Sequence, residues 1–232
     1  MATRLYFPSS GNAPASPAFN AGWEDTTAAS RLKCVTTRIS SAMTTVSFLD
    51  ANRTDRDILF RQYVSDPLAA QTILAQTVKI QMRVRETHAD NNMFLAWAVY
   101  VFSYDGAVLR GTVVALNRDA TESTTTLTNR GDTATSTQVI TQYGDRIVIE
   151  IGMGGNPHDF LGNAHDSDIS IGDNSATDLP EDSTSTTANN AWLEFPNDVT
   201  INKSFESVLN NYQHVDASFG NTGIMSVTEK IK

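Results

Sequence analysis

Apolar and polar residues alternate with a period of two along much of the chain from Met43 onward. In the run QTVKIQMRVRE, residues 76–86, the apolar side chains from Val78 to Val84 occupy even positions, and charged or amide side chains occupy the odd positions between them. Because successive side chains of a β-strand point to opposite faces, this run predicts a strand with one buried and one solvent-facing side.

Several other runs also have the character of strands. MFLAWAVYVFSYDG, residues 93–106, is apolar at odd and even positions alike, which predicts a strand covered on both faces. It ends in Asp105-Gly106, a hairpin signal before the next strand at residues 107–116. GDRIVIEIG, residues 144–152, alternates strongly. Weaker strands are expected at residues 43–49, 57–64, 135–141, 167–173 and 191–195.

Eight or more short strands separated by Ser, Thr, Asn, Asp and Gly predict an all-β fold, an antiparallel β-sandwich that is jelly-roll-like. Little helix is expected, with a turn or two at residues 66–76 and a short C-terminal helix at 204–212. The polar stretches 117–137 and 173–191 are predicted to be long loops. The expected organisation is an extended N-terminal arm over 1–30, a β-sandwich domain over 31–201 and a C-terminal extension over 202–232.

The arm carries both helix-breaking and strongly apolar residues. Pro8, Pro14 and Pro17 favour extended backbone, which gains order only by lying on another surface. Two surfaces are considered, that of a neighbouring subunit and that of the arm's own sandwich. On the first alternative the arm residues that anchor a partner are Leu5, Tyr6, Phe7, Phe19 and Trp23.

Charge and composition limit the kinds of partner that the protein is expected to bind. The 232-residue chain has a formal net charge of -9, which argues against binding nucleic acid through its phosphates. Its single cysteine, Cys34, excludes an intrachain disulfide. No apolar run approaches the roughly 20 residues of a membrane helix. Neither a membrane partner nor a secretory signal is therefore expected, and synthesis is expected in a cytoplasm.

Two groups of side chains are candidates for ligand binding. The stretch 156–173 is rich in His and Asp, and Asp166, Asp168 and Asp173 could hold Ca²⁺, although a solvated acidic loop without a cofactor is the preferred interpretation. Trp192 could stack on a sugar, with a packing role as the alternative. Trp97 lies in the most apolar strand and is expected in the core. No catalytic residues are assigned, because carboxylate pairs are everywhere in an acidic chain and no Ser lies in a GxSxG motif.

Certain motifs resemble a group of proteins encoded by tailed bacteriophages. They are ATRLYFPSSG, GWEDT, ILFRQYVSDPLAAQTI, GDRIVIEIG, HDSDISIGD, TDLPED and WLEF, and the resemblance runs from the first residues to about Phe195. It implies a virion structural component of β-sandwich type and carries over no catalytic residues.

The expected function is that of a phage capsid decoration or cement protein that is not an enzyme. Its expected partners are the phage major capsid protein and copies of itself in a homotrimer, and its expected location is the virion. One alternative is a tail-associated adaptor, baseplate or fibre protein with a carbohydrate-binding sandwich. The other is a glycan hydrolase.

Overall fold

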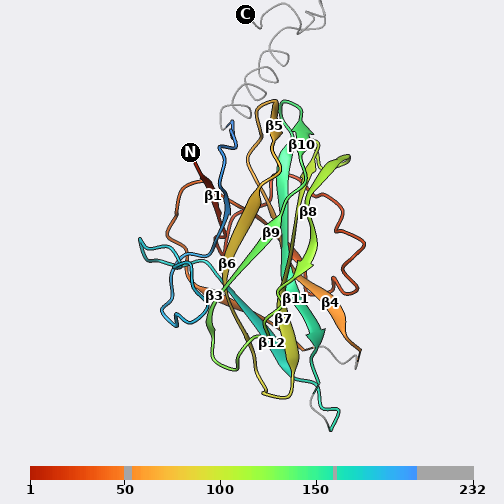
Figure 1. The fold of residues 1–232 in the computed structure, drawn as a ribbon, viewed down its shortest axis with the longest axis vertical. Helices are drawn as coiled ribbons and strands as arrows, with labels where there is room; N and C mark the ends of the chain where they lie inside the picture. The colour runs from red at the N-terminus through yellow and green to blue at the C-terminus, as the bar shows by residue number, and fades with distance from the viewer. Residues whose placement is uncertain (50–53, 159–160, 203–232) are drawn as a thin grey trace, which may run out of the picture.

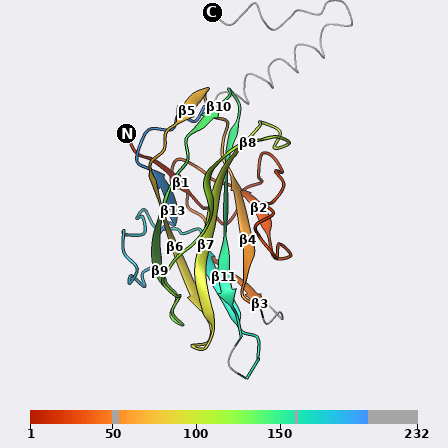
Figure 2. The same cartoon turned by 45° about the vertical axis from the view of Figure 1, so that its right-hand side comes forward.

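Two β-sheets pack face to face in the computed structural model, which describes residues 1–49, 54–158 and 161–202 (Figures 1 and 2). The first sheet has the order β1-β13-β6-β12-β3, with β9 on the other side of β6, and the second has the order β2-β4-β11-β7-β8. The strands of the first sheet are β1 Thr3–Tyr6, β3 Thr44–Leu49, β6 Thr77–Glu86, β9 Thr128–Thr135, β12 Asp166–Ile171 and β13 Trp192–Phe195. Those of the second are β2 Ser30–Lys33, β4 Arg56–Val64, β7 Asn92–Phe102, β8 Leu109–Arg118 and β11 Arg146–Asn156. A separate short pair joins β5 Gln71–Ile73 to β10 Val139–Thr141.

Eight strands follow the topology of a jelly roll. β3 pairs with β12, β4 with β11, β6 with β9 and β7 with β8, always antiparallel, so each pair is nested inside the one before it in the sequence. This nested order places β3-β12-β6-β9 in one sheet and β4-β11-β7-β8 in the other. The predicted all-β, jelly-roll-like sandwich is confirmed.

The core lies between the sheets and is built by the alternation read from the sequence. β6 contributes Val78, Ile80, Met82 and Val84, all with at most 1% of their surface exposed. β7 is buried along both faces, as its apolar character at all positions predicts. The same is true of most of β11, where Ile147, Ile149 and Ile151 point into the core and Val148 lies on the outer face.

The N-terminal segment covers the outer face of the second sheet. Of the two surfaces considered for the arm, it lies on that of its own sandwich and not on that of a neighbouring subunit. β1 pairs with β13, and β2 runs parallel to β4, so residues 1–33 belong to the sandwich itself. Trp23 packs against Leu59 and Ala96 on the outer face of that sheet. The aromatic side chains of this segment therefore bury against their own chain.

The loop 173–191 covers the outer face of the first sheet, which corrects the prediction of a solvent-facing side for β6. The amide of Asn129 donates to the carbonyl oxygens of Pro180 and Asp182, and Arg83 donates to that of Thr186. Gln81 and Arg83 are thereby buried. A polar face of a strand can thus be covered when a polar loop supplies its hydrogen-bond partners.

Two further predictions differ from the structure. Residues 66–76 contain strand β5 instead of a helical turn, because Gln71–Ile73 finds a partner in β10. The stretch 117–137, predicted to be a long loop, contains strand β9, because Thr128–Thr135 pairs with β6. The predicted helix at 204–212 lies outside the described residues. Within the described ranges, no helix is long and apolar enough to cross a membrane.

Candidate functional site: an apolar end of the sandwich

One end of the sandwich gathers exposed apolar side chains from three connections. These are the β4–β6 connection, which contains β5, the β7–β8 turn, and the β9–β11 connection, which contains β10; β5 and β10 mark this end at the top of Figure 1. The exposed side chains, here called the apolar end, are Leu74, Tyr104, Val108, Leu109, Ile140 and Tyr143. Ile140, with 71% of its surface exposed, projects furthest into solvent.

An open groove separates β8 from β10 at this end. Its volume is about 520 Å³, and it is lined by Arg110, Gly111, Thr112, Thr137, Gln138, Val139 and Ile140. A Cβ atom on Gly111 would lie 3.0 Å from both methyl groups of Val139, so glycine allows the two strands to approach closely here. The groove thus lies directly beside the exposed Ile140.

Arg146, the first residue of β11, holds two of the three connections together. Its side chain is buried, its Nε donates to the Tyr104 carbonyl oxygen at 2.9 Å, and one terminal nitrogen donates to the Ser65 carbonyl oxygen at 2.9 Å. The guanidinium also lies 4.5 Å from the centre of the Tyr104 ring. One side chain of β11 therefore fixes the β7–β8 turn and the start of the β4–β6 connection.

Charge at the apolar end is largely compensated within the chain. The buried Asp145 carboxylate accepts hydrogen bonds from Arg110 Nε at 3.2 Å and from the Gln142 backbone N–H at 2.7 Å. Tyr143 accepts a hydrogen bond from the Asn202 amide at 2.8 Å. A surface with exposed apolar groups, a rigid base and paired charges is suited to contact another protein surface.

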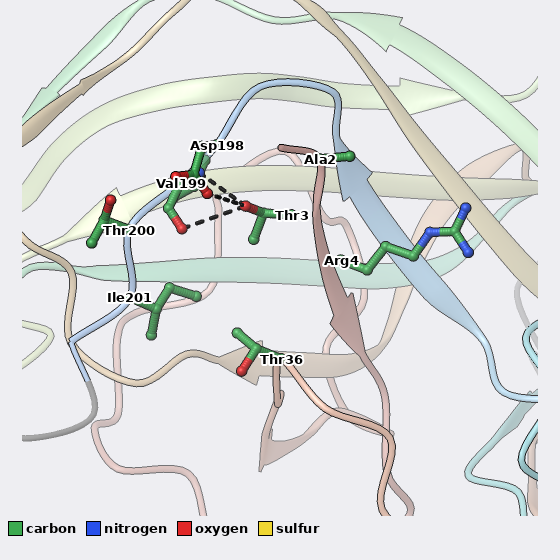
Figure 3. Close-up of a pocket in the computed structure, with 8 residues that line it drawn as sticks. All are labelled: Ala2, Thr3, Arg4, Thr36, Asp198, Val199, Thr200 and Ile201. Atoms are coloured by element: carbon green, nitrogen blue, oxygen red, sulfur yellow. Dashed lines mark hydrogen bonds between the residues drawn. The ribbon is translucent and has the colours of Figure 1, made fainter.

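A second groove, of about 310 Å³, runs beside β1 and is shown in Figure 3. The Thr3 hydroxyl contacts the Asp198 carboxylate at 3.3 Å and accepts a hydrogen bond from the Val199 backbone N–H at 2.9 Å. These bonds fasten the segment after β13 to the first strand. The polar atoms of this groove thus have a structural task.

The predicted arm anchors are not available as a partner surface. Leu5, Phe7 and Trp23 are buried within their own chain. Tyr6 and Phe19 are partly buried, with the Tyr6 hydroxyl bonded to Asp178 and the Arg31 guanidinium 4.0 Å from the Phe19 ring. The prediction that these residues clasp a neighbour is corrected, because the chain's own sandwich takes up the apolar area.

Trp192 is also not a surface platform for a sugar. Its side chain is fully buried, its indole nitrogen donates to the Leu179 carbonyl oxygen at 2.8 Å, and the Arg4 guanidinium lies 4.0 Å from its ring centre. Arg4 itself is held by Glu194 at 2.6 Å and Asp178 at 2.8 Å. Packing under an ion-pair network is therefore the role of Trp192.

The three aspartates proposed for Ca²⁺ have other neighbours. Asp168 is buried and pairs with Arg85 at 2.6 Å, while the Asp173 carboxylate accepts from the Ser175 backbone N–H at 2.6 Å. Asp166 lies at the start of β12. Across the described ranges, no three His, Cys, Asp or Glu side chains gather as metal ligands. The structure therefore does not assemble the predicted calcium site.

Sequence reasoning missed the apolar end. Leu74, Val108 and Ile140 stand among polar residues in connections, where single apolar residues are common and carry no signal by themselves. Only the nested pairing of the strands shows that three distant connections meet at one end. Arg146 could not be singled out either, because a charged residue in an alternating strand is ordinarily expected to face solvent.

No family model matches the chain, and no curated protein matches it either. Among solved structures it is similar to a CocE/NonD family hydrolase from Staphylococcus aureus, with 8% identity and a TM-score of 0.47 over 87% of this chain and 36% of that one. An alpha-amino acid ester hydrolase has 8% identity and a TM-score of 0.45 with the same coverage. Infectious bursal disease virus, Gt strain, has 14% identity and a TM-score of 0.25 over 88% of this chain and 52% of that one.

This chain spans about a third of the length of the hydrolase chains. The prediction that the protein is not an enzyme is contradicted, because hydrolases are among the solved structures that match the chain. The exclusion of enzymatic activity is withdrawn. The β-sandwich part of the predicted resemblance agrees with the strand pairing, and the viral and phage-specific parts stay a prediction.

Proposed function

We propose that this protein is a structural component of a virus particle and that it associates with copies of itself through the apolar end. The observation that carries the proposal is the convergence of exposed apolar side chains from three connections on one end of the sandwich. Burying a large apolar side chain at an interface contributes roughly 1.5 to 3 kcal/mol. Several of them on one rigid surface suit a specific contact.

Charge favours a second copy as the occupant of this surface. Two chains of net charge -9 repel each other, so they meet best where charges are already paired. At the apolar end Asp145 is bonded to Arg110, and Arg146 is enclosed by carbonyl oxygens. A self-association here brings few uncompensated charges together. A trimer about an axis through this end is the arrangement that we propose.

Within the particle we propose a decoration or cement protein of the phage head, bound also to the major capsid protein. The resemblance of the sequence to tailed-phage proteins supports the virion as its location, with assembly in the host cytoplasm. The proposal concerns assembly and makes no statement about catalysis. Antibody labelling of intact particles tests this location. Label over the head supports a decoration or cement protein, and label confined to the tail supports the tail-associated alternative instead.

The oligomeric state of the full-length protein tests the role of the apolar end. We expect light scattering after size exclusion to give a multiple of the 25.3 kDa chain mass, and Ile140→Asp to shift the protein to monomer with its thermal unfolding retained. Leu161→Asp is the matched control, because Leu161 is similarly exposed at 69% but lies in the β11–β12 connection, at the other end. A wild-type monomer at all concentrations contradicts the proposal.

A chain ending at Asn202 distinguishes a second copy from the chain's own C-terminal residues as the occupant. If residues 203–232 cover the apolar end, the full chain is monomeric and the shortened chain associates. If a second copy covers it, both chains associate, and Ile140→Asp separates both into monomers.

A further inference from the structure

The opposite end of the sandwich contains buried polar side chains without partners. Here the β6–β7 turn, the β8–β9 connection and the start of β12 meet under the core. Both side-chain heteroatoms of Asn91, the hydroxyl of Ser123 and the hydroxyl of Ser167 are buried without a hydrogen-bond partner among the described residues. These three residues together with Glu86 are here called the polar cluster.

Hydrogen bonds and strand pairing connect Glu86, Ser123 and Ser167, and Asn91 lies in the adjoining β6–β7 turn. The Met93 backbone N–H donates to Glu86 Oε2 at 3.3 Å, and its carbonyl oxygen accepts from the Ser123 N–H at 2.7 Å. Ser167 stands directly opposite Glu86 in the β6–β12 pairing, where side chains share a face with Cβ atoms roughly 5 Å apart. Asn91 is fully buried, and its backbone N–H closes the β6–β7 turn onto His88.

Glu86 and Ser167 of the polar cluster lie on strand faces that point into the core. Glu86 continues the even-numbered face of β6 that begins with Val78, and Ser167 precedes Ile169 and Ile171 on the inner face of β12. Buried amides and hydroxyls are costly to leave unbonded, and internal water with two to four polar partners is the usual means of satisfying them. The cluster presents donors as well as acceptors, since an amide and two hydroxyls offer both.

We propose that Glu86, Asn91, Ser123 and Ser167 form an internal hydration site, in which bound water links the β6–β7 turn to β12 and to the β8–β9 connection. Water suits this set better than a metal ion does. Glu86 is the only carboxylate in the set, and its carboxylate already accepts the Met93 N–H. The guanidinium of Arg130 donates to the Glu122 carbonyl oxygen at 2.6 Å, which places a positive charge beside the β8–β9 connection.

Glu86 also makes the hydration site a proton-binding site. Burial, aided by the negative charge of Glu122, raises the pKa of the Glu86 carboxyl to about 7. Other titratable groups near this end include Arg130 with Asp119, 3.5 Å apart, and Arg85 with Asp168, 2.6 Å apart. Asp166 begins β12. His88 lies 3.9 Å from Asp90 and stacks on His165 with 4.1 Å between ring centres. A neutral carboxyl gains a proton to donate, so at mildly acidic pH it can bond to the bound water as donor and to Met93 as acceptor.

Magnetisation transfer from water in the ¹⁵N-labelled protein tests the proposal. We expect the Asn91 side-chain amide to show a nuclear Overhauser contact with a long-lived water molecule. Asn190 is the control, because its buried amide donates directly to the carbonyl oxygens of Ser175 and Thr177 at 2.9 and 3.0 Å. It should show no such contact. Asn91→Ala assigns the signal and should abolish it.

A crystal structure of the wild-type protein gives the second, independent test. Water within hydrogen-bond distance of Asn91 and of Glu86 or a cluster hydroxyl supports the site. Direct bonds among the four side chains with nothing between them overturn it. So does an ion with six or more oxygen ligands, which would make this a cation site instead.

Discussion

Trp23 donates a hydrogen bond from its indole nitrogen to the Glu150 carboxylate at 2.7 Å, under the N-terminal segment on the outer face of β11. The Gln62 amide donates to the same carboxylate at 2.9 Å, and the Asn20 backbone N–H donates to it at 3.1 Å. Burial nevertheless raises the pKa of Glu150. This buried carboxylate therefore depends on its three donors, and two of them, Trp23 and Asn20, come from the segment that the sequence predicts to be an extended arm.

Replacement of Trp23 by Phe should destabilise the protein by about 1–3 kcal/mol, because it removes one donor from a buried carboxylate and keeps an aromatic ring against Leu59 and Ala96. Urea unfolding measures the change. In the background Glu150→Gln the same substitution should cost less, since a neutral amide needs the donor less. Equal costs in both backgrounds would show that the indole contributes by packing alone.

Replacement of Trp192 by Ala should cost about 3–5 kcal/mol, because it leaves a void beneath Arg4 and frees the Leu179 carbonyl oxygen. Thermal unfolding provides the measurement, and glycan arrays give the contrasting readout. A variant that keeps wild-type stability but loses binding to a glycan would mean that the ring is at the surface, contrary to the structure.

Replacement of Glu86 by Gln should raise stability at pH 8 by an amount on the order of 1–3 kcal/mol and change it little below pH 5. The folded protein holds the Glu86 proton with a pKa of about 7, well above the unfolded value of 4.5. The proton therefore stabilises the fold fully below the unfolded pKa, and this stabilisation is lost as the pH rises to 7. Unfolding measured at pH 5 and pH 8 compares the variants. A difference of the opposite sign would mean that the carboxylate is stabilised by a cation.

Replacement of Arg146 by Lys should weaken self-association and not only the fold. An ammonium group cannot reach the Tyr104 and Ser65 carbonyl oxygens together as the planar guanidinium does. We expect faster hydrogen exchange in the β7–β8 turn and a weaker dimer or trimer by sedimentation. Arg85→Lys is the control, since Arg85 pairs with Asp168 on the outer face of β6. If Arg146→Lys associates as strongly as the wild-type protein, the buried guanidinium does not contribute to the self-association interface.

Replacement of Gly155 by Ala should destabilise the protein strongly, because its backbone has a φ of +138° and an added Cβ would collide with the Asn92 carbonyl oxygen. Gly11→Ala is the comparison, since its φ is also positive, at +113°, and the added Cβ meets only the Lys33 side chain at 3.9 Å. The difference between the two variants in thermal unfolding measures the steric part. A similar loss of thermal stability in both variants would mean that the positive φ alone, and not the collision, causes the destabilisation.

The sandwich was predictable because alternation is local: Val78 to Val84 and Ile147 to Ile151 are assigned to the core by spacing alone. The segments that cover the outer faces of the two sheets were not predictable in this way. The apolar character of residues 93–102 requires something on the second face of that strand, but nothing in the sequence says that Trp23 provides part of it. Likewise Gln81 and Arg83 look solvated until the loop 173–191 is seen to bond to its neighbours. The candidate site combines three connections, and only tertiary pairing unites them.

The pairing of β1 with β13 sets a condition on how the protein is made. Thr3 lies beside Phe195 and Tyr6 beside Trp192. β1 can therefore pair with β13 only after almost the whole described chain has been synthesised. Contacts between such distant residues form slowly because a long loop must close first. On the ribosome the pairing of β1 with β13 therefore forms late in translation, and until then the strand edge that carries Leu5 is open to chaperones.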